Sequence, residues 1–315
     1  MPVPADFPLA YEGVRPASFS NFVAGKRRDS YISALKPPLT TPYVVAADGS
    51  APFETIQAAV NQAVEDGATP QNAKDIVIRP GTYNEDVDLG LGCNLHGGNG
   101  FADLTSVIIT GTVTFNKASP PGTFFAASIS NIAIITDNII ALNIGNPADR
   151  GILIIACLIV SNHVAGVGVG METSASAEIN FNFSNVNANR GMVLKDMAQV
   201  GIQIGSFDGT VSAIELNDSS RIEAKFLDIE GAGIILEDTS SMILEYSTVG
   251  SALLSSIDVV DVGTTADLSF NTFQSNAAST NWATGLGTIN SGTNNSIRGT
   301  ATNIAVGTYN SFPLA

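Results

Sequence analysis

The chain has 315 residues, of which 14% are charged and 44% are hydrophobic, and its formal net charge at pH 7 is −15. Many apolar residues and few charges exclude an intrinsically disordered chain. The acidic balance argues against nucleic acid as a partner, because binding to phosphates needs a basic surface. No apolar run is long enough for membrane insertion. The first residues, MPVPADFPLAYEG, have no basic start followed by an apolar stretch, so we also expect no secretory signal.

Residues 1–42 are rich in proline and contain a basic run, Lys26, Arg27 and Arg28. Proline fixes the backbone angle φ and lacks an amide hydrogen, so it favours extended chain over regular helix or sheet. We expect an extended N-terminal arm that docks on other structural proteins, with the basic run at the point of docking.

Residues 43–63 predict a short strand at Tyr43–Ala46, a turn at Asp48 and Gly49, and then a helix near 53–63. The apolar residues of the helix recur at helical spacing: Phe53, Ile56, Ala59, Val60 and Ala63. An amphipathic helix of this kind can cover the open end of a β-solenoid and hide a sheet edge that would otherwise recruit other strands.

From Ile76 onwards, short β-rich runs alternate with Gly, Asn, Asp and Ser. Similar runs begin at Ile179, Ile202, Ile222, Ile243 and Leu268, at intervals of 23, 20, 21 and 25 residues. A second feature recurs between them at intervals of 22, 20 and 23 residues: Asp196, Asp218, Asp238 and Asp261. Two features that share a period near 22 residues indicate stacked coils. We expect the four aspartates to form a turn ladder, each capping its own turn through its side chain.

These patterns predict an all-β fold, a single-stranded right-handed parallel β-helix with an N-terminal capping helix. The β-helix is expected over 43–275, and Asn-, Thr- and Gly-rich strands over 276–315 are expected to close it or to contact a neighbouring chain. Cys93 and Cys157 stand in apolar or Gly-rich contexts and are expected to be buried free thiols. No cluster of residues suggests a metal or another cofactor. A catalytic Ser/His/Asp constellation could be built only around His96 or His163, the two histidines of the chain, and no motif supports one.

Residues 44–115 resemble the opening of the pectin methylesterase-like family of right-handed parallel β-helices. VVAADGSAPFETIQAAV resembles the strand, turn and capping helix of that family, and NLHGGNG with SVIITGTVTF resembles its next coil. IVIRPGTYNEDVDL carries the G-x-Y-x-E pattern as Gly81, Tyr83 and Glu85. We expect these three residues to be structural, with the Tyr83 ring packed and Glu85 accepting hydrogen bonds in the first coil.

The resemblance weakens where that family has its catalytic motifs, which resemble QAVAL, QDTL, DFIFG and LGRPW and supply two aspartates, a glutamine and an arginine. NIIAL (138–142) stands near QAVAL with Asn138 in place of Gln, and SNHV (161–164) has Asn162 where an Asp is needed. NRGMV (189–193) lacks the second Asp, and no LGRPW-like stretch exists. Because an amide cannot act as a carboxylate nucleophile, the resemblance implies the fold without that catalytic set.

One enzymatic alternative comes from the repeat itself. Aligning Ile202 with Ile222 gives Asp208 and Asp228 the same position on adjacent coils. Stacked positions lie about 4.8 Å apart, close to the roughly 5–5.5 Å between the carboxylates of retaining glycosidases. Asp208 and Asp228 are therefore the candidate catalytic pair of this alternative.

The main expectation is a non-catalytic structural β-helix protein, a virion component such as a phage tail, fibre, spike or outer-capsid protein. The expected partners are other structural proteins, copies of the same chain in a homo-oligomer, and a glycan surface. The alternatives are a carbohydrate-active enzyme, either a polysaccharide hydrolase or a lyase, and a glycan-binding adhesin. An extracellular location is the alternative to the virion.

Overall fold

The computed structural model describes residues 43–98, 105–117, 125–145, 151–163, 167–173, 178–251, 257–269, 271–275, 281–291, 296–298 and 300–301. The chain consists of two compact units, with the boundary between Thr41 and Pro42. All of the described residues belong to the second unit. The predicted arm, with Lys26, Arg27 and Arg28, lies outside the described residues. Within the described part, no helix combines the length and the apolarity that a membrane crossing requires.

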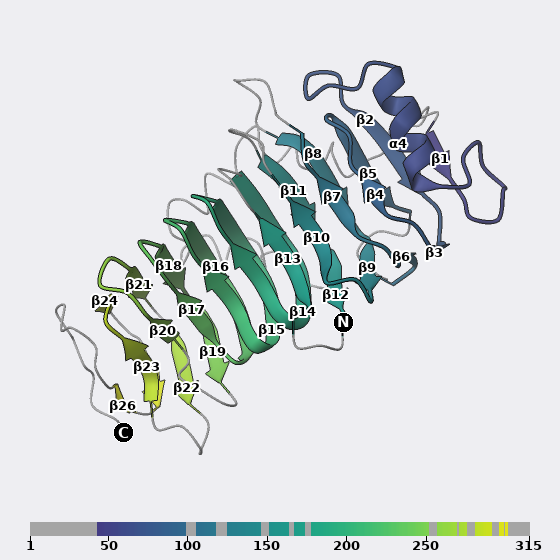
Figure 1. The fold of residues 1–315 in the computed structure, drawn as a ribbon. Helices are drawn as coiled ribbons and strands as arrows, with labels where there is room; N and C mark the ends of the chain where they lie inside the picture. Colours follow the sequence, from purple (N-terminus) through teal and green to yellow (C-terminus); the bar gives the residue numbers. More distant parts are fainter. Residues whose placement is uncertain are drawn as a thin grey trace, which may run out of the picture. The chain divides into compact units, whose positions relative to one another are not determined.

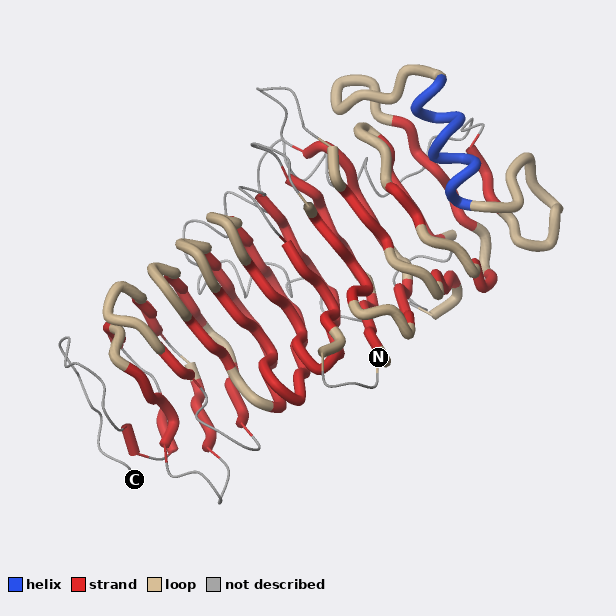
Figure 2. The backbone as a smooth tube through the Cα atoms, viewed as in Figure 1, coloured by secondary structure: helices blue, strands red, loops and turns tan. Residues whose placement is uncertain are grey.

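The second unit is a parallel β-solenoid with one short helix near its start, which confirms the predicted fold class (Figure 1). Its strands pair in register along three ladders, one for each side of a coil. Figure 2 shows the strands in successive layers, with the helix at the N-terminal end of the stack.

The first ladder contains β1 (Tyr43–Val45), β2 (Lys74–Ile78), β5 (Cys93–Gly97), β8 (Phe125–Ser130), β11 (Gly151–Ile155), β14 (Glu178–Leu194), β15 (Gln199–Leu216), β16 (Arg221–Gly231), β18 (Ser241–Glu245), β21 (Thr265–Ser269) and β24 (Thr288–Ser291). The second contains β3 (Gly81–Tyr83), β6 (Val107–Ile109), β9 (Ala133–Thr136), β12 (Leu158–Ser161), the middle of β14 and β15, the end of β16, and then β19 (Thr248–Ser251), β22 (Thr272–Ser275) and β25 (Ser296–Arg298). The third contains β4 (Val87–Asp88), β7 (Val113–Phe115), β10 (Ile140–Ile144), β13 (Val169–Thr173), the ends of β14 and β15, and then β17 (Ile234–Leu236), β20 (Ile257–Val259), β23 (Asn281–Gly285) and β26 (Thr300–Ala301).

The core runs along the inside of the stack, because residues in register repeat the same inward apolar position. One inward column of the first ladder is fully buried: Ile76, Leu95, Ile129, Ile154 and Phe181. A side chain of this kind stabilises the fold by about 1.5–3 kcal/mol when it leaves water. A single coil could not bury such a column, so the fold depends on the array.

The capping helix is α4 (Ile56–Glu65), whose buried face consists of Ile56, Ala59, Val60 and Ala63. The predicted start at Phe53 is corrected, because Thr55 is the N-cap and its hydroxyl accepts from the Ala58 amide at 3.3 Å. Phe53 instead stands before the helix and stacks on Tyr43, with ring centroids 6.4 Å apart.

Glu85 holds the first turn of α4 from the first coil. Its two carboxylate oxygens accept from the backbone amides of Ile56 at 2.7 Å and Gln57 at 2.9 Å. These amides have no partner inside the helix, and the positive end of the helix dipole favours a carboxylate there. Tyr83 is buried and its hydroxyl donates to the Arg79 carbonyl at 2.8 Å, while the Gly81 amide donates to Ser106 on the next coil.

The aspartates of the turn ladder differ from the expectation in the direction of their hydrogen bonds. Asp196, Asp218 and Asp238 have φ values of 54°, 52° and 56°, the left-handed region that aspartate tolerates better than most residues. The carboxylate of Asp238 accepts from the Asp218 amide at 3.2 Å, and that of Asp261 accepts from the Asp238 amide at 2.7 Å. The side chains of Asp238 and Asp261 therefore link neighbouring coils.

Cys93 and Cys157 are both buried and free, as expected. Burial raises the pKa of Cys93 to about 11 and the pKa of Cys157 to about 12, because a thiolate is poorly solvated in the core. Both thiols therefore remain protonated at neutral pH and serve as packing groups.

Candidate functional site

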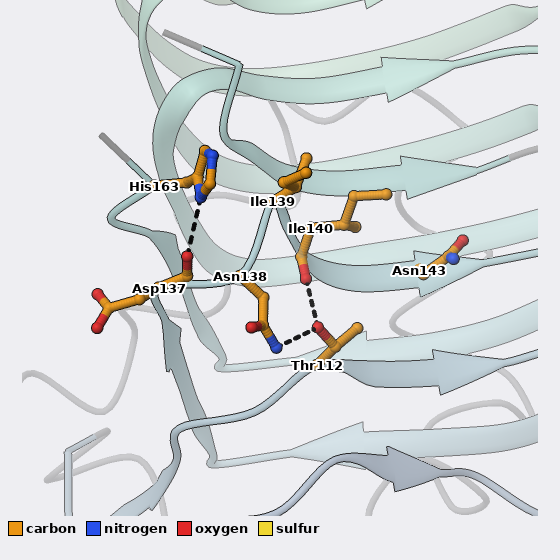
Figure 3. A pocket seen from close by; sticks show the side chains of 7 residues that line it. All are labelled: Thr112, Asp137, Asn138, Ile139, Ile140, Asn143 and His163. Atoms are coloured by element: carbon orange, nitrogen blue, oxygen red, sulfur yellow. Dashed lines mark hydrogen bonds between the residues drawn. The ribbon is translucent and has the colours of Figure 1, made fainter. Parts of the chain in front are cut away.

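An open pocket of about 420 Å³ lies where the chain turns from β9 into β10. Its lining comes from three consecutive coils: Thr112, Asp137, Asn138, Ile139, Ile140, Asn143 and His163 (Figure 3). Two of the segments that stand near the expected catalytic motifs, 138–142 and 161–164, contribute to this pocket. Stacking thus brings together residues that the sequence separates by one coil.

The amide of Asn138 is held in place on the pocket wall. Its Nδ2 donates to Thr112 Oγ1 at 3.0 Å and lies 3.4 Å from Asp86 Oδ1. The Thr112 hydroxyl in turn donates to the Ile140 carbonyl at 2.7 Å. Asn138 is exposed, and none of the described residues donates a hydrogen bond to its Oδ1. This oxygen is available to accept from a ligand hydroxyl.

His163 has a defined tautomer in this pocket. Its Nδ1 lies 3.0 Å from the backbone carbonyl of Asp137. Because a carbonyl oxygen can only accept, Nδ1 carries the hydrogen, and the lone pair of the neutral imidazole is on Nε2. Nε2 is therefore the basic nitrogen of this half-buried ring, which forms part of the pocket lining. Figure 3 shows that the Asp137 carboxylate points away from Asn138 and Thr112, so Asp137 acts on the ring through its backbone.

Neighbouring polar residues support the pocket from behind. Ser161 is buried, and its hydroxyl donates to the Asn138 carbonyl at 2.8 Å. On the next coil, Asn189 Oδ1 accepts from the Gly168 amide at 3.1 Å, and Asn189 Nδ2 donates to Thr210 at 2.9 Å. Asn162 is exposed and is not part of the pocket lining. Near the expected DFIFG position, Asn189 is an amide held by structural hydrogen bonds. Near the expected QDTL position, Asn162 is an amide exposed to solvent.

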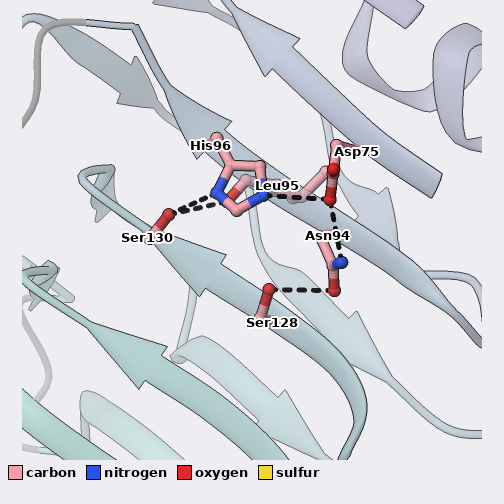
Figure 4. A network of polar contacts seen from close by, with 6 residues as sticks. All are labelled: Asp75, Asn94, Leu95, His96, Ser128 and Ser130. Atoms are coloured by element: carbon pink, nitrogen blue, oxygen red, sulfur yellow. Dashed lines mark hydrogen bonds and ion pairs between the residues drawn. The ribbon is translucent and has the colours of Figure 1, made fainter. Parts of the chain in front are cut away.

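A Ser/His/Asp constellation does form, but around His96 (Figure 4). His96 Nδ1 lies 2.7 Å from Ser130 Oγ, and His96 Nε2 lies 3.3 Å from Asp75 Oδ1. Burial raises the pKa of Asp75, but hydrogen bonds from His96 and Asn94 outweigh it and hold that pKa below its usual value. Ser130 is only 1% exposed, so a substrate cannot reach its hydroxyl. The constellation ties β2, β5 and β8 together.

The register places the candidate glycosidase residues differently from the sequence alignment. Asp208 pairs with Glu230, and Asp228 pairs with Ser206 and Thr248. The alignment slipped by two residues because Ile202 is in register with Ala224, not with Ile222. A slip of two leaves the inward and outward alternation unchanged, so the apolar pattern could not detect it. Asp208 and Asp228 are therefore not stacked partners.

Within the described residues, no group of three or more His, Cys, Asp or Glu could hold a metal ion. The sequence did not single out Thr112, Asp137 or Asn143, which lie outside the segments 138–142 and 161–164. These three residues have common types and become part of a site only through the stacking of the coils around the turn between β9 and β10. The visible signals were those two segments and the rarity of histidine, because the chain has only His96 and His163.

No protein-family model matches the sequence. A segment of 43 residues is 54% identical to a pectinesterase from Ralstonia solanacearum, covering 14% of this chain and 10% of that protein. Two structures of the pectin methylesterase from Aspergillus niger superpose with TM-scores of 0.51 and 0.52, each at 14% identity over 87% of this chain and 92% of the other. The chain has the pectin methylesterase-like β-helix fold. The match to the curated relative is confined to about a tenth of its length.

These comparisons correct the main functional expectation. We expected a non-catalytic structural protein of a virion and no enzyme, because the residues at the family's catalytic positions are amides. That prediction is wrong, because the chain shares a 54% identical segment with a pectinesterase. None of the proteins named above is a component of a virion, a tail or a spike. The carbohydrate-active alternative agrees better with the relatives.

Proposed function

We propose that the protein is a carbohydrate esterase that hydrolyses methyl esters on an acidic polysaccharide, with its active site in the pocket around His163. The observation that carries the reaction class is the segment that is 54% identical to a pectinesterase. The pocket supports the same reading, since it is open, lies across three coils and presents amide and hydroxyl groups suited to sugars. The fold supplies a long surface along which a polysaccharide chain can bind.

The base in this proposal is His163, because Asn138 and Asn162 replace the residues that the family resemblance would require. Water adds to the carbonyl carbon of the ester while Nε2 of His163 takes one of its protons. The tetrahedral intermediate expels the alkoxide, which receives that proton and leaves as methanol. A carboxyl group remains on the sugar and ionises at neutral pH.

The remaining lining residues hold the substrate. Asn143 is half-buried, and its amide makes no side-chain hydrogen bond with any described residue, so it is available to the ester or to a ring hydroxyl. Asn138 offers its Oδ1 as an acceptor. Ile139 is 51% exposed, which provides an apolar contact for the methyl group or the face of a sugar ring. The pocket lining thus contains the base His163, the polar side chains of Asn138 and Asn143, and the apolar side chain of Ile139.

The test is methanol release from methyl-esterified polygalacturonate by the wild type and by His163→Gln, which keeps a polar side chain of similar reach. General-base catalysis is worth roughly 10²–10⁴-fold, so we expect His163→Gln to lower kcat by at least about a hundredfold. Asn185→Ala is the matched control, because Asn185 is exposed on a neighbouring coil and does not line the pocket. A variant His163→Gln with the wild-type rate would refute the role of His163.

A further inference from the structure

A second pocket lies on a different side of the coils, on the first ladder. Its residues come from β14, β15 and β16, which run next to each other in Figure 1. It has a volume of about 240 Å³. Its lining is Asn180, Gln199, Val200, Gly201, Arg221 and Glu223. This volume is below the roughly 300–1,000 Å³ of pockets for drug-sized ligands, and it is suited to a single sugar unit of a longer chain.

Gly201 creates this pocket. It stands in register between Asn180 on β14 and Glu223 on β16, so its missing side chain leaves a gap between two outward side chains. Its φ does not lie in the left-handed region, so the backbone itself does not require glycine. A Cβ at this position would lie 3.4 Å from Asn180 Oδ1, an ordinary contact. Glycine inside a strand weakens the strand, and it often marks a place where a ligand approaches the backbone.

The polar groups around the gap are not used by the fold. Arg221 and Gln199 are in register with each other and exposed, and Glu223 is exposed two positions beyond Arg221. None of these three side chains forms an ion pair or a hydrogen bond with another residue of the described part. A guanidinium binds a carboxylate through two parallel hydrogen bonds, whereas a carboxylate and amides bind hydroxyl groups. The combination matches a ligand that carries both a carboxylate and neighbouring hydroxyls.

We infer that this pocket, which we call the Gly201 notch, binds a uronic acid unit of an acidic polysaccharide, with its carboxylate on Arg221 and its hydroxyls on Glu223 and Asn180. The inference rests on the proposed function in one respect, since ester hydrolysis would produce the free carboxylate. The notch lies on the first ladder, whereas the His163 pocket is formed around the turn into the third. A polysaccharide that has been de-esterified could thus remain bound to the protein away from the reaction site.

The test is isothermal titration of the full chain with an oligogalacturonate that carries no ester, so no turnover takes place. We expect the wild type to bind it at least about tenfold more tightly than its methyl-esterified form. Gly201→Leu, which fills the notch, and Arg221→Gln, which removes the charge, should each lose at least about tenfold in affinity. His163→Gln and Asn185→Ala should bind like the wild type. Circular dichroism checks that each variant is folded.

The inference is overturned if the wild type does not bind the oligogalacturonate, or if Gly201→Leu and Arg221→Gln bind it with wild-type affinity. Its failure is distinguishable from that of the proposed function, because methanol release is measured separately on the same variants. Gly201→Leu should release methanol at the wild-type kcat. Notch-dependent binding without any methanol release would remove the esterase proposal and leave this inference standing.

Discussion

Replacing Glu85 by alanine should loosen the helix that covers the first coil. The carboxylate accepts two backbone hydrogen bonds, from Ile56 at 2.7 Å and Gln57 at 2.9 Å. A hydrogen bond to a charged group contributes about 1.5–3 kcal/mol, and Glu85 is partly exposed, so the lower end applies to each bond. The expected loss is therefore about 3 kcal/mol in the free energy of opening α4. Glu85→Gln keeps one acceptor oxygen and should lose about half as much.

Hydrogen exchange at the amides of Ile56 and Gln57 measures this loss where it occurs. A loss of 1.4 kcal/mol corresponds to a tenfold change in an equilibrium constant, so Glu85→Ala should make both amides exchange about a hundredfold faster. Glu65→Ala is the control, because Glu65 is exposed at the other end of the same helix. Exchange rates in Glu85→Ala that equal those of the control would show that Glu85 does not hold the first turn of α4.

Three further outcomes are expected. The pKa of Asp75 is lowered in the folded protein, so the ionised carboxylate stabilises the fold above the unfolded pKa of about 3.9. This stabilisation is lost as the pH falls through the folded pKa. Asp75→Asn should therefore flatten the decline of the urea midpoint below about pH 4. Cys93 and Cys157 should not react with a thiol reagent in the native protein at pH 8, and both should react after unfolding in urea. Gly97→Ala should destabilise the fold by about 3 kcal/mol in urea titrations, since its Cβ would lie 1.9 Å from the Asn131 carbonyl oxygen; a wild-type midpoint would contradict this.

The sequence was informative about the fold because the features that define it are local and periodic. The apolar spacing of Ile56, Ala59 and Val60 predicted the buried face of α4, and the recurring aspartates predicted the turns. The exact register was not predictable, because Ile202 fits equally well beside Ile222 or beside Ala224, which has the same orientation. The pairing of Asp208 with Glu230 follows from that register alone.

The candidate site was less predictable, because it depends on contacts between coils. Neither the tautomer of His163 nor the anchoring of Asn138 by Thr112 is visible in the sequence, as both come from hydrogen bonds between residues that are 26 positions apart. The functional expectation was wrong for a related reason. Missing aspartates in the family's motifs do not by themselves exclude an active site, because a histidine from a neighbouring coil can supply a base.

Hydrolysis of methyl esters by this protein is tested by measuring two products of one reaction. Wild-type protein is incubated with methyl-esterified polygalacturonate at constant pH, and the methanol formed is compared with the alkali consumed. We expect the amount of methanol to rise in proportion to the amount of protein, with one equivalent of acid for each methanol. A rate of methanol formation no higher than that of buffer alone would contradict it.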